Sequence, residues 1–212
     1  MRLLLIRHGQ SQGNVDAIIQ GADDPLTDFG RSQAHAVGRF LHQRHEVTRL
    51  YASPLARARE TAEIIGSYID LAPALEPGLA EINTGEAAGL TWTEWTLANP
   101  ELAERLSARD PSFEESWVGG ESGREFVDRI FVAYDRIVTQ HLGTDDIVAV
   151  VSHGGPLAWI SAHVHGDPKE QWPHDRAVFV NCSISELVID EKGVHTIGAW
   201  NQTSHLEMIR EA

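Results

Sequence analysis

The chain has 212 residues with 17 Lys or Arg against 31 Asp or Glu, which gives a formal net charge of −14 when the histidines are neutral. A composition of 42% hydrophobic and 23% charged residues is that of a globular protein and excludes a disordered, collagen-like or coiled-coil chain. The excess of negative charge argues against binding to nucleic acid or to an anionic membrane, because those partners favour clustered cations, so any anionic ligand needs a local group of positive side chains.

The first quarter of the chain predicts two strand–helix units. Residues 3–6 are a continuous apolar run of the kind that is buried in a parallel sheet, and a polar cluster follows them. The spacing of apolar residues predicts a helix over about 28–44. A short strand at 49–52 precedes Ser53 and Pro54, which we expect to be the N-cap and the first-turn proline of the next helix.

The middle of the chain is less regular. Residues 72–111 contain a glycine-rich stretch and two short helical pieces separated around Pro100. We expect about residues 83–120 to form a segment outside the regular strand–helix units, called the excursion below, that covers the substrate. Ser122 and Glu125 fit a capping box, and the apolar residues that follow repeat at helical spacing, which predicts a long helix.

The last third predicts a strand, a helix and a hairpin. Residues 147–151 are a second fully apolar run, and a glycine-rich turn and a helix follow it. Two further apolar segments, 179–180 and 184–189, precede a turn at 190–193, and we expect them to form an edge that can pair in a homodimer. The alternation of strands and helices predicts an α/β three-layer sandwich, with a mostly parallel central sheet and helices on both faces.

Composition and local patterns also bear on organisation and compartment. No linker, repeat or low-complexity tract interrupts residues 1–212, so we expect a single domain. Residues 1–8 have too few apolar positions for a signal peptide, and histidines, glycines and a proline break the uncharged run at 147–166, so we expect no membrane span. The single cysteine, Cys182, is typical of a reducing compartment, and we expect a cytoplasmic protein.

Two apolar strands that are far apart in the sequence each end in a histidine followed by glycine, at residues 7–9 and 152–154. A lone histidine at a strand end is more often structural than functional, but two at matching strand ends favour a site at the carboxyl edge of the sheet. Arg57 follows the second strand and belongs near the same edge. The alternative is a solvated helix arginine, as we expect for Arg59.

Longer motifs surround these residues in a fixed order. From the amino terminus they are Leu5-Ile6-Arg7-His8-Gly9-Gln10-Ser11-x-x-Asn14, Gln20-Gly21, Asp24-Pro25-Leu26-Thr27, Tyr51-Ala52-Ser53-Pro54-Leu55-x-Arg57-Ala58-x-x-Thr61-Ala62, Leu79-x-Glu81-Ile82, Gly119-Gly120-Glu121-Ser122 and Val151-Ser152-His153-Gly154-Gly155. With these motifs the chain resembles the histidine phosphatase superfamily, also called phosphoglycerate-mutase-like, over nearly its whole length. The resemblance implies a phosphoglycerate-mutase-like fold and a phosphoryl-transfer site.

The resemblance also implies a role for each matching residue. His8 would be the nucleophile that forms a phosphohistidine, with its other ring nitrogen held by a backbone carbonyl. Arg7, Arg57 and His153 would surround the phosphoryl oxygens. Glu81 would give a proton to the leaving group and later take one from water. The remaining matches, expected to contact phosphate or substrate, are Asn14, Gln20, Gly21 and Gly154.

This reaction needs no metal and no cofactor, and its substrate would be a small phosphorylated metabolite. His42 and His45, and likewise His163 and His165, are spaced as metal ligands can be, but they lack the cysteine or carboxylate partners of a closed site. We therefore expect them at the surface or at helix ends. Bisphosphoglycerate would be required as a cofactor only by a mutase.

Phosphatases and mutases share these catalytic residues, and a non-catalytic phospholigand-binding protein is a third alternative. Mutases of the family usually carry a Tyr-Gly pair close behind the acid glutamate and an Arg-Arg pair in a longer insertion. Here Glu81 is followed by Ile82-Asn83-Thr84-Gly85-Glu86. The only arginines in residues 97–111 are Arg105 and Arg109, which are not adjacent. These departures favour hydrolysis, and the occupied catalytic positions argue against a binding protein.

Three tryptophans, Trp92, Trp95 and Trp117, fall within the excursion. Two interpretations remain open for them: a hydrophobic wall for the substrate, or packing of the excursion against the rest of the protein.

Overall fold

The computed structural model describes residues 1–44, 46–107, 113–168, 173, 178–207 and 209. In this part of the chain six strands form a sheet in the order β3-β2-β4-β1-β5-β6. The strands are β1 (Arg2–Arg7), β2 (Arg49–Ala52), β3 (Ala74–Leu75), β4 (Ile147–Ser152), β5 (Ile184–Ile189) and β6 (His195–Ile197). The pairs β1–β4, β2–β4 and β2–β3 are parallel, whereas β1–β5 and β5–β6 are antiparallel, so the sheet is mostly parallel as predicted.

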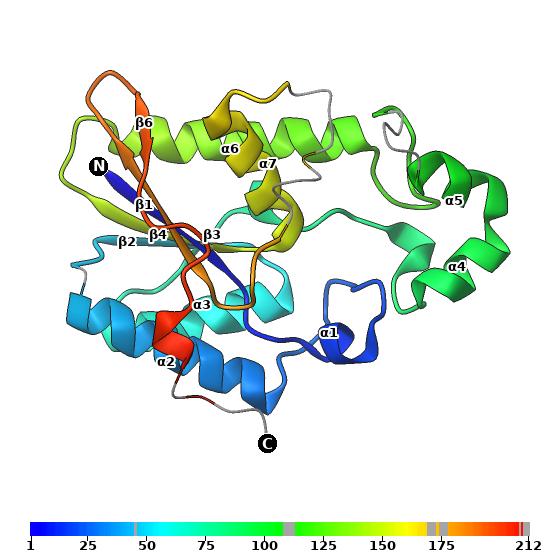
Figure 1. Ribbon diagram of the computed structural model, residues 1–212, viewed down its shortest axis with the longest axis horizontal. Coiled ribbons are helices and arrows are strands. Elements are labelled where there is room, and N and C mark those ends of the chain that lie inside the picture. Colours follow the sequence, from blue (N-terminus) through cyan, green and yellow to red (C-terminus); the bar gives the residue numbers. More distant parts are fainter. Residues whose placement is uncertain (45, 108–112, 169–172, 174–177, 208, 210–212) are drawn as a thin grey trace.

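Helices cover both faces of this sheet. The helices of the described residues are α1 (Gln12–Asp16), α2 (Asp28–Arg44), α3 (Ala56–Ile69), α4 (Trp92–Ala98), α5 (Pro100–Ser107), α6 (Gly123–His141) and α7 (Gly154–His165). Figure 1 shows α2 and α3 on one side of the sheet and α6 and α7 on the other, which confirms the three-layer sandwich. No helix among the described residues is both long enough and apolar enough to cross a bilayer.

The central strand β1 explains why its sequence is apolar without alternation. Leu3 and Leu5 belong to the core cluster that includes side chains of α6 and α7, whereas Leu4 and Ile6 belong to the cluster formed with α2 and α3. All four side chains are fully buried. Burying each one stabilises the fold by about 1.5–3 kcal/mol, so β1 joins the two cores and fixes the position of the residues that follow it.

The predicted dimer edge at 184–189 is wrong. These residues form β5, which lies between β1 and β6 and is therefore an inner strand. The turn at 190–193, which the sequence does predict, brings His195–Ile197 alongside β5. Residues 179–180 are not a strand, and the Phe179 side chain is buried in the core.

The predicted start of α3 is also wrong. The helix begins at Ala56, and its N-cap is Leu55, which makes no side-chain capping bond. The hydroxyl of Ser53 accepts a hydrogen bond from the Leu55 amide at 3.2 Å and contacts His153 at 2.7 Å. These contacts engage the Ser53 hydroxyl outside the helix. Ser53 and Pro54 therefore precede α3 and do not cap it.

The excursion forms α4 and α5, with a break before Pro100 as predicted. Figure 1 shows these two helices set apart from the sheet. The rings of Trp92, Trp95 and Trp117 pack on one another with centroid distances of 4.7 to 6.2 Å, and Trp95 is 1% exposed. Trp95 forms a small core with Ala87 and Ala103. The three tryptophans therefore pack mainly within the excursion itself, and Ile19 is the member of this cluster that lies outside residues 83–120.

Candidate active site

The two histidine-glycine pairs meet at the carboxyl edge of the sheet. Arg7, the last residue of β1, lies directly opposite Ser152 of β4 in the parallel pair. The next residues, His8 and His153, are therefore neighbours, and their ring centroids are 5.0 Å apart. Both imidazoles are almost completely buried. The register of two parallel strands thus places these residues together, as the sequence predicted.

Arg57 lies in the first turn of α3, which follows the adjacent strand β2. Its Nε donates a hydrogen bond to His8 Nε2 at 3.3 Å, and its Nη1 donates to the carbonyl oxygen of Gly21 at 2.8 Å. The side chain is 1% exposed, so it is not a solvated helix arginine. By contrast, Arg59 is exposed and lies near Glu63.

A cavity of about 190 Å³ opens at this place. The residues that line it are Arg7, His8, Ile19, Gln20, Arg57, Glu81, Ile82, Thr84 and Gly154. Most of the residues predicted from the motifs, which come from separate parts of the chain, therefore share one small cavity. Its size suits a phosphoryl group, and the two arginines supply the positive charge.

The hydrogen bonds of His8 fix its tautomer. Arginine can only donate, so the Nε2 atom that meets Arg57 carries the lone pair. The other nitrogen, Nδ1, then holds the proton and donates to the carbonyl oxygen of Gly9 at 2.7 Å. Burial lowers the pKa of His8 well below its usual value, and the charges of Arg57 and Arg7 lower it further. His8 is thus a neutral imidazole with a lone pair directed at the cavity.

The backbone of Gly9, whose carbonyl oxygen orients His8, is held in place by Thr61. Its amide donates to the Thr61 hydroxyl at 3.1 Å, and that hydroxyl donates to the Arg57 carbonyl oxygen at 2.7 Å. A Cβ atom at position 9 would lie 2.5 Å from the carbonyl oxygen of Gly30. Glycine is therefore required here, because the start of α2 packs against this backbone.

Arg7 is fixed by the segment that precedes β5. Its Nη1 donates to the carbonyl oxygen of Phe179, and its own carbonyl accepts from the Cys182 amide at 3.0 Å. The side-chain amide of Asn181 donates to the His8 carbonyl at 3.0 Å. Burial lowers the pKa of Arg7, and the nearby Glu81 carboxylate acts in the opposite direction. The guanidinium remains a cation, because burial does not remove its proton.

His153 is held by Ser53. Its Nε2 lies 2.7 Å from the Ser53 hydroxyl, which already accepts a hydrogen bond from Leu55. The hydroxyl can donate to His153 Nε2 or accept from it, so this contact fits either tautomer of the imidazole. Burial lowers the pKa of His153 well below its usual value, with further contributions from His8 and Arg57. Among the described residues, no group pairs with His153 Nδ1 or with Arg7 Nε, so two buried nitrogen atoms remain for a ligand.

Glu81 reaches the cavity from the loop that follows a 3₁₀ turn at Pro77–Leu79. Its Oε1 accepts from the Ile82 amide and its Oε2 from the Gly155 amide, both at 3.0 Å. A Cβ atom at position 155 would lie 2.2 Å from Oε1, so glycine is needed at that position as well. The carboxyl group is half-buried and lines the same cavity as His8.

The other predicted contacts divide into two groups. Gln20 and Gly154 line the small cavity. Gly21 lies next to it, and its carbonyl oxygen accepts from Arg57. Asn14 is not among the described lining residues: its Oδ1 accepts from the Ser11 amide in the capping box of α1, and from the side chain of Asn181. A role for Asn14 in substrate binding stays a prediction.

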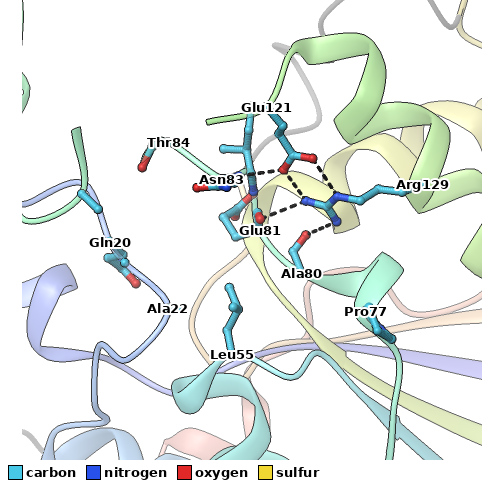
Figure 2. A pocket seen from close by; sticks show the side chains of 13 residues that line it. Gln20, Ala22, Leu55, Pro77, Ala80, Glu81, Asn83, Thr84, Glu121 and Arg129 are labelled. Atoms are coloured by element: carbon cyan, nitrogen blue, oxygen red, sulfur yellow. Dashed lines mark hydrogen bonds and ion pairs between the residues drawn. The ribbon is translucent and has the colours of Figure 1, made fainter. Parts of the chain in front are cut away.

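A second cavity of about 370 Å³ adjoins the first (Figure 2). The residues that line it are Gln20, Gly21, Ala22, Leu55, Pro77, Ala80, Glu81, Ile82, Asn83, Thr84, Ala88, Glu121 and Arg129. Gln20, Glu81, Ile82 and Thr84 line both cavities, which makes them one continuous recess. Its wall is mostly uncharged, and the two charged side chains opposite Gln20 pair with each other.

Sequence reasoning gave no role in the site to three residues that shape it. Ser53 and Thr61 belong to a motif that was recognised, but their partners, His153 and Gly9, are remote in the sequence and become visible only in the fold. No pattern in the sequence indicated a role for Asn181. In the part of the chain that the structure describes, no group of three or more His, Cys, Asp or Glu residues is placed to hold a metal ion.

Comparisons with known proteins agree with this arrangement. The family model described as "Histidine phosphatase superfamily (branch 1)" matches residues 3–203. A glucosyl-3-phosphoglycerate phosphatase of Mycolicibacterium vanbaalenii is 34% identical over 81% of this chain and 77% of its own length. A metal-independent phosphoserine phosphatase of Arabidopsis thaliana is 29% identical over 98% of this chain and 84% of its own. Other relatives bear the names of phosphoglycerate mutases or mutase-like proteins.

The fold is similar to that of solved structures as well. The structure of Bacillus stearothermophilus YhfR superposes with a TM-score of 0.86 at 28% identity, and the match covers 97% of this chain and 99% of that protein.

Proposed function

Because this chain belongs to the histidine phosphatase superfamily (branch 1), we propose that it is a metal-independent phosphomonoester hydrolase that acts through a phosphohistidine on His8. The observation that carries the proposal is the neutral His8 imidazole, whose Nε2 lone pair lies beside Arg57 at the cavity while its Nδ1 proton is held by Gly9. Phosphoryl transfer requires such a nucleophile, positive donors around the phosphoryl oxygens and a proton for the leaving oxygen.

In the first step the lone pair of His8 Nε2 forms a bond to phosphorus. The ester P–O bond breaks with its electron pair on oxygen, and Glu81 gives that oxygen a proton, so the alcohol departs. Arg7 and Arg57 stabilise the charge on the phosphoryl oxygens, and the Nδ1–H of His153 donates to one of them. The Nδ1 proton of His8 stays on its bond to Gly9 throughout.

In the second step water attacks the phosphohistidine. The Glu81 carboxylate takes a proton from the water as its oxygen bonds to phosphorus. The N–P bond then breaks, the electron pair returns to Nε2, and inorganic phosphate leaves. The sum of the two steps converts ester and water into alcohol and phosphate, and both His8 and Glu81 regain their starting states.

The alternative is a phosphoglycerate mutase, which the names of some relatives favour. A mutase must hold the carboxylate or second phosphate of its substrate beside the reacting group. Among the described residues of the larger cavity, the cation is Arg129, and its guanidinium is engaged by Glu121 and by backbone carbonyls. This arrangement supports hydrolysis of a monoester whose alcohol is uncharged.

The test is phosphate release from a panel of phosphomonoesters in EDTA, with wild type and His8→Ala side by side. We expect metal-independent release by the wild type and a loss of at least about 10³-fold in His8→Ala, because no other group on the cavity wall replaces the nucleophile. The panel includes 3-phosphoglycerate with and without its bisphosphate. Interconversion of phosphoglycerates without phosphate release would identify a mutase, and neither activity would identify a binding protein.

A further inference from the structure

The loop that carries Glu81 is held from behind by one side chain of α6. Arg129 Nη1 donates to the carbonyl oxygens of Ala80 at 2.7 Å and Gly78 at 3.2 Å, and its Nη2 donates to the carbonyl oxygen of Glu81 at 3.0 Å. One guanidinium therefore binds three carbonyls within four successive residues. Figure 2 shows Arg129 reaching this loop from the far side of the larger cavity.

Glu121 completes the arrangement. Its two carboxylate oxygens accept from Arg129 Nε at 2.9 Å and Nη2 at 2.6 Å, so the pair is bidentate. The same carboxylate accepts from the Asn83 amide at 2.7 Å, and the Glu121 amide donates to the Asn83 carbonyl at 2.9 Å. The loop is thus held on both sides of Glu81, at residues 78–80 by the arginine and at residue 83 by the glutamate.

The geometry requires an arginine. A lysine has a single ammonium group and cannot direct a planar fork at a carboxylate while it also binds three carbonyls. The guanidinium lies 4.9 Å from the centre of the Phe126 ring, which supports its position. The Arg129 and Glu121 side chains are 26% and 15% exposed, so these bonds are partly shielded from water.

We propose that Arg129 and Glu121 act as a pair of positioning residues that hold the Glu81 carboxyl group at the reacting oxygen. The proposal rests on the hydrolase function proposed above. The Glu81 carbonyl is bound to Arg129 while its carboxyl group is bound to Gly155, so the two ends of this residue are anchored to α6 and to α7. Loss of the first anchor lets the peptide rotate and withdraws the proton donor from the leaving group.

The test compares two esters whose leaving groups differ in their need for a proton. Phenolate from p-nitrophenyl phosphate leaves without one, whereas the alkoxide of glycerol 2-phosphate requires one. We expect Arg129→Gln to lower kcat/KM for glycerol 2-phosphate by about 10²-fold or more and for p-nitrophenyl phosphate by less than about tenfold. In a Glu81→Gln background the same change should add no further loss on the alkyl ester.

Three further variants make the outcome decisive. Arg129→Lys and Glu121→Gln should change the ratio of the two rates in the same direction, and they carry the test if Arg129→Gln does not fold. Arg136→Gln is the matched control, because Arg136 also belongs to α6 but pairs with Glu76 and is largely exposed, and it should leave the ratio unchanged.

Equal losses on both esters, or further loss in the Glu81→Gln background, would overturn the positioning role and leave the proposed hydrolase intact. Equal phosphate release by wild type and His8→Ala would overturn the hydrolase and the positioning role together.

Discussion

At the scale of single residues, the site consists of side chains whose protonation is set by a neighbour. His8 keeps its proton on Nδ1 because the Gly9 carbonyl oxygen accepts it, and the Ser53 hydroxyl binds the Nε2 atom of His153. The family resemblance implies the first contact, which is a backbone carbonyl at the second ring nitrogen of His8. The sequence does not predict the contact between Ser53 and His153, because the pattern around Ser53 indicates a helix cap and the two residues are remote in the sequence.

Stability should fall in mild acid because His8 and His153 are buried in the neutral form. Burial lowers the pKa of both residues in the folded state. Below the ordinary histidine pKa of about 6.5 the unfolded chain therefore binds protons that the folded chain does not, and folding loses up to about 1.4 kcal/mol per pH unit for each histidine. The contribution of the two neutral histidines to the free energy of unfolding is complete above about pH 6.5 and declines as the pH falls.

Urea unfolding at several pH values between about 5 and 8 measures this dependence. His153→Gln should give a shallower decline than the wild type, because one of the two neutral histidines is gone. His35→Gln, which changes an exposed histidine of α2, should retain the wild-type slope. If the free energy of unfolding changes equally with pH in the wild type and in His153→Gln, His153 does not contribute to the loss of stability in acid.

At the scale of elements, apolar runs predicted the strands that carry the site, and polar or short segments escaped prediction. β1 and β4 are buried on both faces, so their sequences are unbroken apolar runs. β3 is two exposed residues, Ala74–Leu75, and such a segment has no hydrophobic pattern to detect. β5 was assigned to an edge because its sequence does not reveal that β1 covers the side that the predicted hairpin leaves open.

The start of α2 packs directly on the loop that carries the nucleophile. A Cβ atom on Gly30 would lie 2.0 Å from the carbonyl oxygen of Gln10. We expect Gly30→Ala to destabilise the protein by about 1–3 kcal/mol and also to lower kcat/KM by tenfold or more, because the displaced loop moves His8.

Gly38→Ala provides the matched comparison within the same helix. Its Cβ atom would lie 2.4 Å from the Tyr68 ring, between α2 and α3 and away from the loop after β1. Thermal unfolding and phosphate-release kinetics of both variants separate the two effects. Gly38→Ala should lose stability alone, and a similar loss of activity in both variants would refute a specific link between Gly30 and the nucleophile.

At the scale of the whole molecule, a small cluster of cations is embedded in a strongly acidic chain. The formal net charge is −14, yet the buried Arg57 and the half-buried Arg7 both lie beside His8. Burial lowers the pKa of both guanidinium groups. The Glu81 carboxylate acts in the opposite direction on both, and the charge of Arg7 makes a smaller contribution that lowers the pKa of Arg57. Two like charges in one cavity oppose folding, so an anion bound between them should stabilise the protein.

Phosphate or vanadate should therefore raise Tm. At a concentration about 100 times Kd the gain is about 2.7 kcal/mol, which corresponds to roughly 5–10 °C for a chain of this size. Differential scanning fluorimetry at constant ionic strength measures the shift, with sodium chloride as the reference salt. Arg57→Gln should remove most of it, and a wild-type Tm that phosphate leaves unchanged would contradict this interpretation.

The position of β1 in the sheet has a consequence for synthesis of the protein. This strand is made first, but its partners β4 and β5 lie at Ile147–Ser152 and Ile184–Ile189. At about 5–20 residues per second the ribosome needs roughly ten to thirty seconds to deliver the first of them, and until then the strand that leads to the nucleophile has no partner. The nascent chain must therefore keep an apolar segment from aggregating during that interval, and an amino-terminal fragment that ends before β4 lacks both the partner of β1 and His153.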